Sequence, residues 1–398
     1  MINLIPTEAL EYKSGDIIRG FSAALSHEPP YEALHIDGIG DCIPTRSART
    51  AIIVALKALN LQAGARIGVP LYCCPVVFKA IKVANCVPIF IDSDPKTFCI
   101  SAEDLTTKNA EMDALIAVHM FGNVCDMPSL QEAMKNKPII EDCAQSLGSR
   151  LDGRLTGSFG NIAFFSFRLG KYLSAGEGGA LFSNDVNLRL RMFKLAANLP
   201  ISTPIEELKH VIENYIRSKL RNKPFWGIAG YSIWGVYNKK TDFISKSPIV
   251  LSQIFKSDLA IVRKRLASLD SMIKANRDNA QFYLRNVQLD PSLLYIESPR
   301  TFYNRLMFPI TFRSPEDRNE IAEYLKRQHI SLSKPYEEVI EGAARYYGYE
   351  GDCPIAEQLL RRTIVIPSHY KLKKKELGRI VKCINEGWAK ITNKARRH

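Results

Sequence analysis

The 398-residue sequence lacks a hydrophobic run long enough to cross a bilayer. Its longest nearly apolar stretch, from Gly227 to Tyr237, falls well short of the ~20 residues that a membrane-spanning helix needs. The N-terminus has no basic start followed by an apolar segment, so we expect no signal peptide. Repeats and low-complexity tracts are also missing, and the ordinary share of hydrophobic residues, 46%, excludes disordered and fibrous classes.

The nine cysteines lack the spacings that metal sites and disulfide frameworks use. There is no C-x-x-C motif and no Cys/His pair at the spacing of zinc ligands. An odd number of cysteines in this pattern favours reduced thiols. We therefore expect a cytoplasmic protein without a structural metal ion.

Acidic residues are in deficit. The chain has 54 Lys and Arg against 41 Asp and Glu, which gives a net charge of +13. This excess favours an anionic partner, such as a phosphate-bearing substrate, nucleic acid or an acidic membrane surface, but does not choose among them. The length suggests two to three domains of roughly 150 residues each, with cores that need no disulfide or metal.

Between residues 47 and 185, short apolar runs rich in β-formers alternate with helix-like stretches. This alternation predicts an α/β fold with a mostly parallel sheet covered on both faces. The expected strands are Arg66–Pro70, Val87–Asp92, Ala114–Phe121, Pro138–Asp142, Asn161–Phe167 and Gly179–Asn184. The expected helices are Ala48–Leu59, Val76–Ala84 and Pro128–Lys135. Ligands bind such sheets at the carboxyl ends of the strands, so polar residues there are the candidates for chemistry.

The pattern changes after residue 190. Residues 205–222 look helical and basic, and one long helical pattern runs from about Pro248 to Leu284. The last hundred residues alternate strand, helix, strand, helix, which is typical of an α+β unit. We predict a large α/β domain over residues 1–247 and a small C-terminal α+β domain over residues 248–398.

The segment from Ile139 to Asp185 carries the densest set of chemical groups. One expected strand ends in Glu141 and Asp142, another ends near Ser166, and Lys171 follows five residues later. Pyridoxal phosphate needs such a set: a lysine that bonds to it covalently, an acid for its ring nitrogen, and hydroxyl and N–H groups for its phosphate. A lone lysine is more often a solvated charge, and a lone aspartate more often a helix cap. Their combination at neighbouring strand ends favours the cofactor site.

These residues carry a resemblance. The stretch EDCAQSLGS, followed by GSFGNIAFFSFRLGKYLSAGEGGALFSND, resembles the signature of the DegT/StrS group of sugar aminotransferases, which are fold-type I pyridoxal-phosphate enzymes. Further stretches with similar counterparts in that family are VPIFIDSDPKT at Val87–Thr97, VHMFGNVCDM at Val118–Met127 and PIAEQLLRRTIVIPSHYKLKKKE at Pro354–Glu376. The likeness spans about residues 40–190 and 250–390.

The resemblance implies a role for each matching residue. Lys171 would hold the cofactor and afterwards move the proton at the reacting carbon. Asp142 would pair with the ring nitrogen, because an opposite charge nearby favours its protonated form. Gln145 would donate an amide hydrogen to the 3-hydroxyl group, and Ser166 would bind the phosphate.

Two cofactor contacts depart from the family pattern. The phosphate anchor is expected at a helix N-terminus made by Ser47, Ala48 and Arg49, with Ala48 and Arg49 where Gly and Thr usually stand. Arg49 would add a charge-assisted contact there, or would be a surface residue of the first helical turn. The aromatic residue that covers the cofactor ring in the family is replaced by Cys74. Tyr72 would supply the ring instead, or Cys74 would pack there as a small apolar group.

The third departure lies at residues 196–247, where relatives are shorter and carry an Asn-Tyr-Arg turn that reaches the neighbouring subunit's phosphate. Only Tyr237-Asn238-Lys239 faintly resembles that turn. The Trp and Tyr residues there, with basic residues between 217 and 240, resemble a membrane-interface patch. A packed lid or dimer contact with a solvated basic rim is the alternative we favour. Nucleic acid is weakly supported, since no helix-turn-helix, RNA-binding or zinc motif appears.

The resemblance implies a homodimeric enzyme that aminates a keto-sugar, most often nucleotide-linked, with glutamate as donor. Its setting would be cell-surface polysaccharide or amino-sugar biosynthesis, and a doubly anionic sugar nucleotide suits the net charge of +13. A sugar dehydratase using the same cofactor is one alternative, but family dehydratases typically carry His in place of Lys171. The other alternative is a non-catalytic membrane- or partner-binding protein on the same scaffold.

Overall fold

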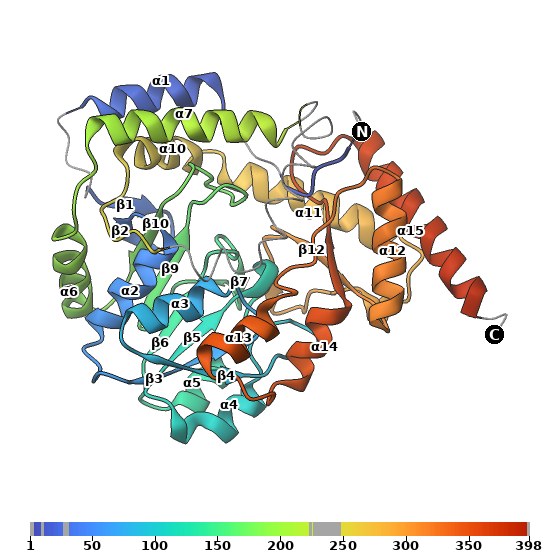
Figure 1. The fold of residues 1–398 in the computed structure, drawn as a ribbon, viewed down its shortest axis with the longest axis horizontal. Coiled ribbons are helices and arrows are strands. Elements are labelled where there is room, and N and C mark those ends of the chain that lie inside the picture. The colour runs from blue at the N-terminus through green and yellow to red at the C-terminus, as the bar shows by residue number, and fades with distance from the viewer. Residues whose placement is uncertain (1–3, 9–11, 27–31, 223–224, 226–247, 396–398) are drawn as a thin grey trace.

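The computed structural model describes residues 4–8, 12–26, 32–222, 225 and 248–395 (Figure 1). At its centre the described residues form an eight-stranded sheet in the order β1-β2-β10-β9-β6-β5-β3-β4. The strands are β1 (Leu34–Ile36), β2 (Gly40–Thr45), β3 (Arg66–Pro70), β4 (Val87–Ile91), β5 (Ala114–Val118), β6 (Ile139–Asp142), β9 (Ile162–Ser166) and β10 (Gly179–Phe182).

The sheet is mostly parallel, which confirms the predicted fold class. Strands β4, β3, β5, β6 and β9 run parallel to one another, and β10 runs antiparallel to both β9 and β2. Val118 of β5 lies opposite Asp142 of β6, so the carboxyl ends of these strands lie level. All five residues of Ala114–Val118 are buried, as expected for a strand covered on both faces.

Helices cover both faces of the sheet, and alternate residues of β9 show the two sides. Ile162 and Phe164 pack in the cluster that contains helix α2, whereas Ala163 and Phe165 pack in the cluster with residues of α10. The helices of the α/β segment are α2 (Ala48–Ala58), α3 (Val76–Val83), α4 (Ala102–Lys108), α5 (Met127–Met134) and α6 (Val186–Ala197). Over the second face lie α1 (Ser14–Ala24), α7 (Pro204–Leu220) and α10 (Lys256–Leu266) (Figure 1).

The prediction of one long helix from about residue 248 to 284 is wrong, because the helix is interrupted. The structure has two helices, α10 (Lys256–Leu266) and α11 (Leu269–Asn286), separated at Ala267 and Ser268. The N–H of Ser268 bonds to the carbonyl of Arg265, which closes a turn between them. Apolar residues keep helical spacing across this turn, so the pattern alone conceals the break.

The C-terminal part has a core of its own. Strands β12 (Phe308–Thr311) and β13 (Thr363–Ile366) pair antiparallel and pack with α11, α12 (Pro315–Arg327) and α15 (Lys374–Ala395). The remaining elements are α13 (Val339–Tyr347), α14 (Pro354–Arg362) and a small sheet of β7 (Arg150–Leu151), β8 (Arg154–Leu155) and β11 (Thr301–Phe302). The division at residue 247 stays a prediction, and the packing puts α10 with the large sheet rather than with this core.

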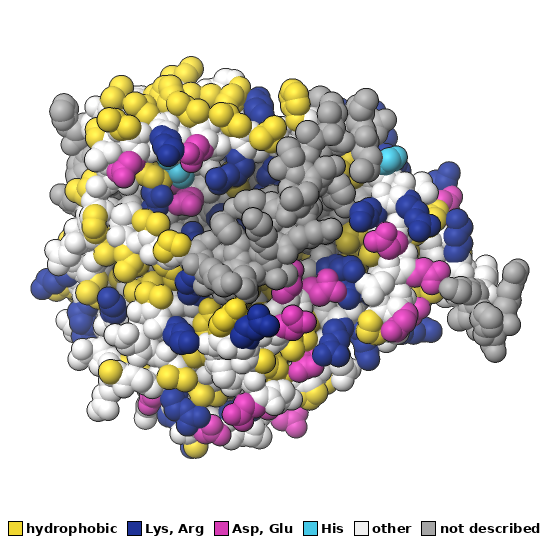
Figure 2. All heavy atoms as spheres, viewed as in Figure 1, with side chains coloured by type: hydrophobic (Ala, Val, Ile, Leu, Met, Phe, Trp, Pro, Cys, Tyr) yellow, Lys and Arg dark blue, Asp and Glu magenta, His cyan; other side chains and the backbone are white. Residues whose placement is uncertain are grey.

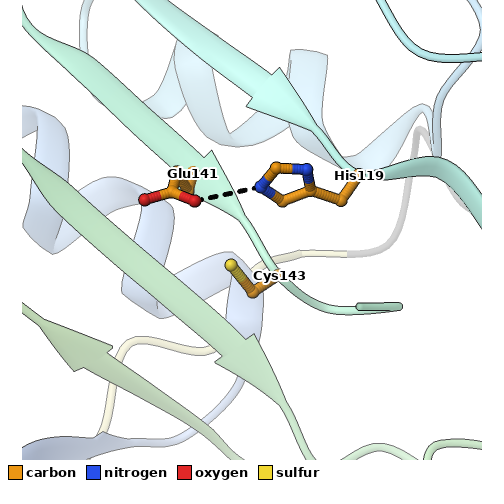
Figure 3. A group of neighbouring side chains, drawn as sticks. All are labelled: His119, Glu141 and Cys143. Atoms are coloured by element: carbon orange, nitrogen blue, oxygen red, sulfur yellow. Dashed lines mark hydrogen bonds and ion pairs between the residues drawn. The ribbon is translucent and has the colours of Figure 1, made fainter. Parts of the chain in front are cut away.

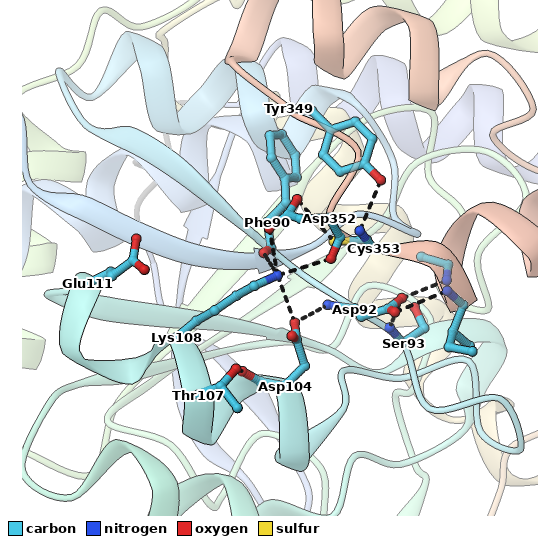
Figure 4. Close-up of polar contacts among 12 residues, drawn as sticks. Phe90, Asp92, Ser93, Asp104, Thr107, Lys108, Glu111, Tyr349, Asp352 and Cys353 are labelled. Carbon is cyan, nitrogen blue, oxygen red and sulfur yellow. Dashed lines mark hydrogen bonds and ion pairs between the residues drawn. The ribbon is translucent and has the colours of Figure 1, made fainter.

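A polar joint ties the C-terminal part to the large sheet (Figure 4). The carboxylate of Asp92, just after β4, accepts the N–H groups of Ile355 and Ala356 at 3.0 and 2.7 Å, and so caps the start of α14. Nearby, the ammonium group of Lys108 lies 2.7 Å from Asp352 and 3.0 Å from Asp104. These contacts hold the C-terminal residues against the carboxyl end of β4.

None of the nine cysteines, all of which belong to the described residues, is bonded to another. Among the helices that the structure describes, none has a stretch both long and apolar enough to span a membrane.

The carboxylate of Glu141 in β6 has four hydrogen-bond partners. It accepts N–H groups from Gly157, Phe159 and Gly160 at 2.8, 2.7 and 2.6 Å, and its Oε2 lies 3.0 Å from Nε2 of His119. The turn after β8 is thereby fixed to the middle of the sheet. Both Glu141 and His119 are fully buried, so these groups have no access to water.

We expect Glu141→Ala to lower the free energy of unfolding by about 3–5 kcal/mol, because His119 and the N–H of Gly157 would be buried without this partner and the partly buried N–H groups of Phe159 and Gly160 would lose it. The measurement is the urea midpoint followed by circular dichroism. Exposed Glu103 offers the matched control, and Glu103→Ala should cost less than about 0.5 kcal/mol. Equal midpoints for the two variants would contradict the structural role of Glu141.

Candidate active site

Four strands place residues at or just after their last positions along one edge of the sheet. Cys74 follows β3, His119 follows β5, Asp142 ends β6 and Ser166 ends β9. Because these strands are parallel neighbours, all four residues lie at the carboxyl edge, where ligands bind in open α/β sheets. The loop between β9 and β10 then carries Lys171.

Lys171 and Asp142, the two residues on which the sequence argument depends, influence each other's charge. Burial and, after it, the charge of Arg168 lower the pKa of the Lys171 amine to about 8, against the opposing charge of Asp142. Burial raises the pKa of Asp142 to about 6, against the N–H of Ala144 at 2.9 Å and the charge of Lys171. Both side chains therefore face the same region, and shifts of this size mark functional sites more often than surface positions.

Gln145 is oriented so that its amide hydrogens point away from the backbone. Its Oε1 accepts the N–H of Phe121 at 3.0 Å, so Nε2 is the atom that faces the hydroxyl of Tyr336, 3.4 Å away. Nε2 also lies 3.5 Å from Sδ of Met120, so both of its hydrogens have long contacts here. The expected hydrogen bond to a 3-hydroxyl group would replace one of them.

The residues expected to bind phosphate lie next to one another around Gly179. In the sheet Gly179 pairs with Ser166 on one side and Thr45 on the other, and the N–H of Gly178 bonds to the carbonyl of Arg46. A Cβ atom on Gly179 would lie 2.7 Å from the backbone nitrogen of Ala48 and 2.8 Å from the carbonyl oxygen of Phe165. Only glycine permits this close approach, which places the start of α2 beside the end of β9.

The N-terminus of α2 has the geometry of an anion site. Ser47 caps the helix by accepting the N–H of Thr50 at 3.2 Å. Within the described part of the chain, the N–H groups of Ala48 and Arg49 have no hydrogen-bond partner, as is usual for the first turn. Such N–H groups and the helix dipole attract phosphate, so the residues present fit the phosphate of the expected cofactor.

The two arginines of this segment differ. Arg46 forms an ion pair with Glu177 at 3.0 Å and stacks on the ring of Phe255, 3.5 Å from its centroid. Arg49 is partly exposed and has no hydrogen bond or ion pair among the described residues. Its guanidinium group is therefore available to an anion at the start of α2.

The structure separates Tyr72 from Cys74. Tyr72 is fully buried, and its ring lies edge-to-face with Phe98, Phe121 and Tyr336 at centroid distances of 6.1, 5.9 and 6.4 Å. Burial raises the pKa of its hydroxyl, and the opposing influences come from Thr363 and Arg318 rather than from Lys171. Burial also raises the pKa of the Cys74 thiol, but there the opposing influences include Arg168 and Lys171. Cys74 thus faces the site, and Tyr72 packs behind it.

Tyr336 is a site residue that sequence reasoning missed. It comes from the C-terminal part, yet burial and then the charge of Cys74 raise the pKa of its hydroxyl, with Arg168 and Asp142 also acting on it. Its backbone adopts a φ of 61°, a conformation rare for a bulky side chain. No motif marks it, because the sequence could not show which C-terminal loop returns to the sheet edge.

Asn304 was also missed. Its side-chain amide nitrogen donates to the carbonyls of Gln145 and Leu147 at 2.9 and 3.0 Å, and its backbone carbonyl accepts the hydroxyl of Tyr172. The residue therefore joins the loop of Gln145 to the loop of Lys171. An isolated asparagine between short strands gives no signal of this in the sequence.

His119, Glu141 and Cys143 form a buried group in which three possible metal-ligand atoms lie within 4.8 Å of one another (Figure 3). The N–H of Cys125 donates to Nδ1 of His119 at 3.1 Å, so Nε2 carries the hydrogen that Glu141 accepts. Both imidazole nitrogens and the carboxylate are already engaged. We interpret the group as a structural hydrogen-bond network.

The insertion at 196–247 is only partly described. Helix α7 (Pro204–Leu220) confirms the predicted helix. Tyr237, Asn238 and Lys239 lie outside the described residues, as does most of the basic and aromatic patch predicted over 217–240.

Comparison with curated proteins finds sugar aminotransferases. GDP-perosamine synthase of Escherichia coli O157:H7 is 28% identical over 341 residues, which cover 84% of this chain and 82% of that protein. The UDP-N-acetyl-3-dehydro-alpha-D-glucosamine 3-aminotransferase of Acidithiobacillus ferrooxidans is 24% identical over 361 residues, 89% of this chain and 86% of that one. L-glutamine:2-deoxy-scyllo-inosose aminotransferase of Micromonospora echinospora is 34% identical over 174 residues, 42% of this chain and 41% of that one.

Solved structures share the fold. The aminotransferase TlmJ from Streptoalloteichus hindustanus superposes with a TM-score of 0.77 at 19% identity. The superposition covers 98% of this chain and 100% of the TlmJ chain. An aminotransferase from Brucella abortus gives a TM-score of 0.71 at 18% identity, covering 94% of this chain and 95% of its own.

The sequence matches the model of one protein family over residues 32–204 and 233–385, which is most of the chain. Those ranges contain the strand ends described above and both Asp142 and Lys171. The chain belongs to the DegT/DnrJ/EryC1/StrS aminotransferase family, and it is a sugar aminotransferase that uses pyridoxal phosphate.

Proposed function

We propose that this aminotransferase moves an amino group from glutamate to a keto-sugar carried on a nucleoside diphosphate, in amino-sugar or cell-surface polysaccharide biosynthesis. The observation that carries the proposal is the mutual electrostatic influence of Lys171 and Asp142 beside an unpaired helix N-terminus. Two relatives are named for GDP- and UDP-linked sugars, and the excess of 13 positive charges suits such anions.

Within the site we assign Lys171 to the covalent bond with the cofactor and to proton transfer at the reacting carbon. Its amine has a pKa of about 8, which lets it both accept and release a proton near neutral pH. Pyridoxal phosphate, when bound, supplies an electron sink for the bonds that break. Asp142 would pair with the ring nitrogen, because an opposite charge nearby favours the protonated form of that nitrogen.

The remaining contacts position the cofactor. Ser166, the cap Ser47 and the N–H groups of Ala48 and Arg49 bind its phosphate, and the Arg49 side chain adds a charge. Gln145 donates to the 3-hydroxyl group through Nε2. Cys74, rather than Tyr72, lies against the ring, because Tyr72 is enclosed by other aromatic side chains.

We further propose a cytoplasmic homodimer, which rests on the family resemblance. A dehydratase reaction on the same scaffold is disfavoured, because Lys171 is present where family dehydratases typically have His. A purely binding role is disfavoured because the curated relatives that match over most of this chain are named as sugar-modifying enzymes.

The direct test of the proposed reaction is a spectroscopic half-reaction assay. Glutamate should bleach the visible absorbance of the holoenzyme, and a GDP- or UDP-linked keto-sugar should restore it. Lys171→Ala should have no such absorbance, whereas Lys194→Ala, at an exposed site on α6, should behave as the native protein. Failure of every nucleotide-linked keto-sugar in a panel to restore the absorbance would refute the acceptor assignment.

The pKa of Lys171 makes cofactor attachment pH-dependent. The neutral amine attacks the cofactor's aldehyde, so the rate of attachment to cofactor-free protein should rise with pH and reach half its maximum near the pKa of about 8. An ordinary lysine would need a pH near 10.4. Stopped-flow absorbance between pH 6.5 and about 9.5 measures this rate. A rate that is still rising tenfold per pH unit at the upper end would contradict the lowered pKa.

Arg49 offers a test of the phosphate site. We expect Arg49→Gln to weaken binding of pyridoxal phosphate by about tenfold or more, the usual value of one charge-assisted hydrogen bond. Binding of pyridoxal, which has no phosphate, should be unchanged. Fluorescence titration of cofactor-free protein measures both, and Arg285→Gln at an exposed position of α11 is the control. Equal losses for the two ligands would place Arg49 elsewhere.

A further inference from the structure

Helix α7 carries its apolar side chains outward. Ile205, Ile212, Ile216 and Leu220 are spaced along one face and are all exposed, Ile205 to 78%. The opposite face, buried against the protein, carries mostly polar residues: Glu207, His210, Asn214 and Ser218, with Val211 as the apolar exception. A surface helix normally has the reverse arrangement, with its apolar stripe toward the core.

The polar inner face has specific partners, which fixes the helix in this orientation. Glu207 accepts the N–H of Lys256 at 2.7 Å and the hydroxyl of Ser257 at 2.7 Å. His210 lies 2.9 Å from the carboxylate of Asp258, a residue with no exposed surface. Rotating α7 to hide its isoleucines would break these contacts and leave buried groups unpaired, at high cost.

Helix α1 extends the same surface. It lies beside α7 along the upper edge of the molecule, where the space-filling view has a band of hydrophobic side chains (Figures 1 and 2). Ile18 and Leu25 are exposed to 72% and 65%. We call this surface the outer ridge, and it consists of Ile18, Leu25, Ile205, Ile212, Ile216 and Leu220. Contiguous apolar surface of this kind marks an interaction site.

Positive charge accompanies the ridge. The exposed charged side chains on the two helices and the residue before α1 include five cations and two carboxylates. They are Lys13, Arg19, Lys209, Arg217 and Lys219, against Glu206 and Glu213. The ammonium group of Lys219 lies 5.0 Å from the ring centroid of Tyr215. Apolar residues on one side and cations around them are the composition of helices that lie on anionic membranes.

We propose that the outer ridge binds the surface of an anionic phospholipid bilayer, with α1 and α7 lying along the headgroup region. A second copy of the chain fits less well, because a two-fold contact of this face with itself would bring its excess cations together. An anionic bilayer is attracted by the same cations. The inference extends beyond the proposed reaction and does not depend on which sugar is aminated.

Vesicle co-sedimentation of the full-length holoenzyme tests the proposal. Vesicles of phosphatidylcholine with about 30% phosphatidylglycerol provide the anionic surface, and pure phosphatidylcholine provides the neutral one. We expect binding to the anionic vesicles, weaker binding to the neutral ones, and a decrease when salt is raised. Absence of binding to the anionic vesicles at low salt would overturn the proposal.

Variants separate the ridge from the rest of the surface. The double variant Ile212→Glu with Ile216→Glu should reduce binding to anionic vesicles at least tenfold, and Lys209→Gln with Lys219→Gln should reduce it less and weaken its salt dependence. The control is Leu190→Glu on α6, whose side chain is 50% exposed, close to the 52% of Ile216. Circular dichroism and the cofactor's absorbance confirm folding. Equal loss with the control would overturn the assignment to this ridge.

Light scattering after size-exclusion chromatography tests whether a second copy of the chain, rather than lipid, covers the outer ridge. The ridge variant should keep the native protein's mass, because the ridge contacts lipid in our proposal. If the ridge variant instead halves the mass, the face is a contact between copies and the lipid proposal is wrong. Aminotransferase activity on soluble substrate should be unchanged in the ridge variant, so the half-reaction assay and this test fail independently.

Discussion

The opposition between burial and charge at Lys171 and Asp142 is the constraint on which the site depends. Burial pushes both groups toward their neutral forms, giving pKa values of about 8 and 6, while each charge stabilises the other. An amine and a carboxylate held in this balance are costly to keep unless a ligand uses them. The sheet brings the two groups together because Asp142, the last residue of β6, lies opposite Phe164 of the parallel strand β9, and Lys171 follows the end of β9.

Backbone geometry around this pair matters as much as the side chains. Gly179 lets β10 pass against the first turn of α2, which brings the helix N-terminus beside the end of β9. Glu141, the neighbour of Asp142 along β6, points to the other side and fixes the turn at residues 157–160. One strand therefore supplies a structural carboxylate and the carboxylate that we propose for the cofactor's ring nitrogen, because successive side chains in a strand face opposite ways.

Much of this could be predicted from the sequence, because continuous apolar runs and glycine-rich turns are local signals. Strand β3 was placed at its observed limits, and Lys171, Asp142 and Gln145 were chosen from one contiguous segment. The sequence did not reveal contacts between residues that are distant along the chain. Tyr336 and Asn304 reach the site from the C-terminal part, and no spacing along the chain predicts that return. The break at Ser268 was hidden because apolar residues keep helical spacing across it, and α7 was predicted as a helix without its inverted faces, since its polar face is satisfied by α10.

The central claim is that the amine of Lys171 bonds to pyridoxal phosphate. Reduction of the holoenzyme with borohydride makes that bond permanent, and mass spectrometry of the digested protein then locates the modified residue. We expect one phosphopyridoxyl group per chain, on the peptide that contains Lys171. Modification of another lysine, with the Lys171 peptide unlabelled, would contradict it.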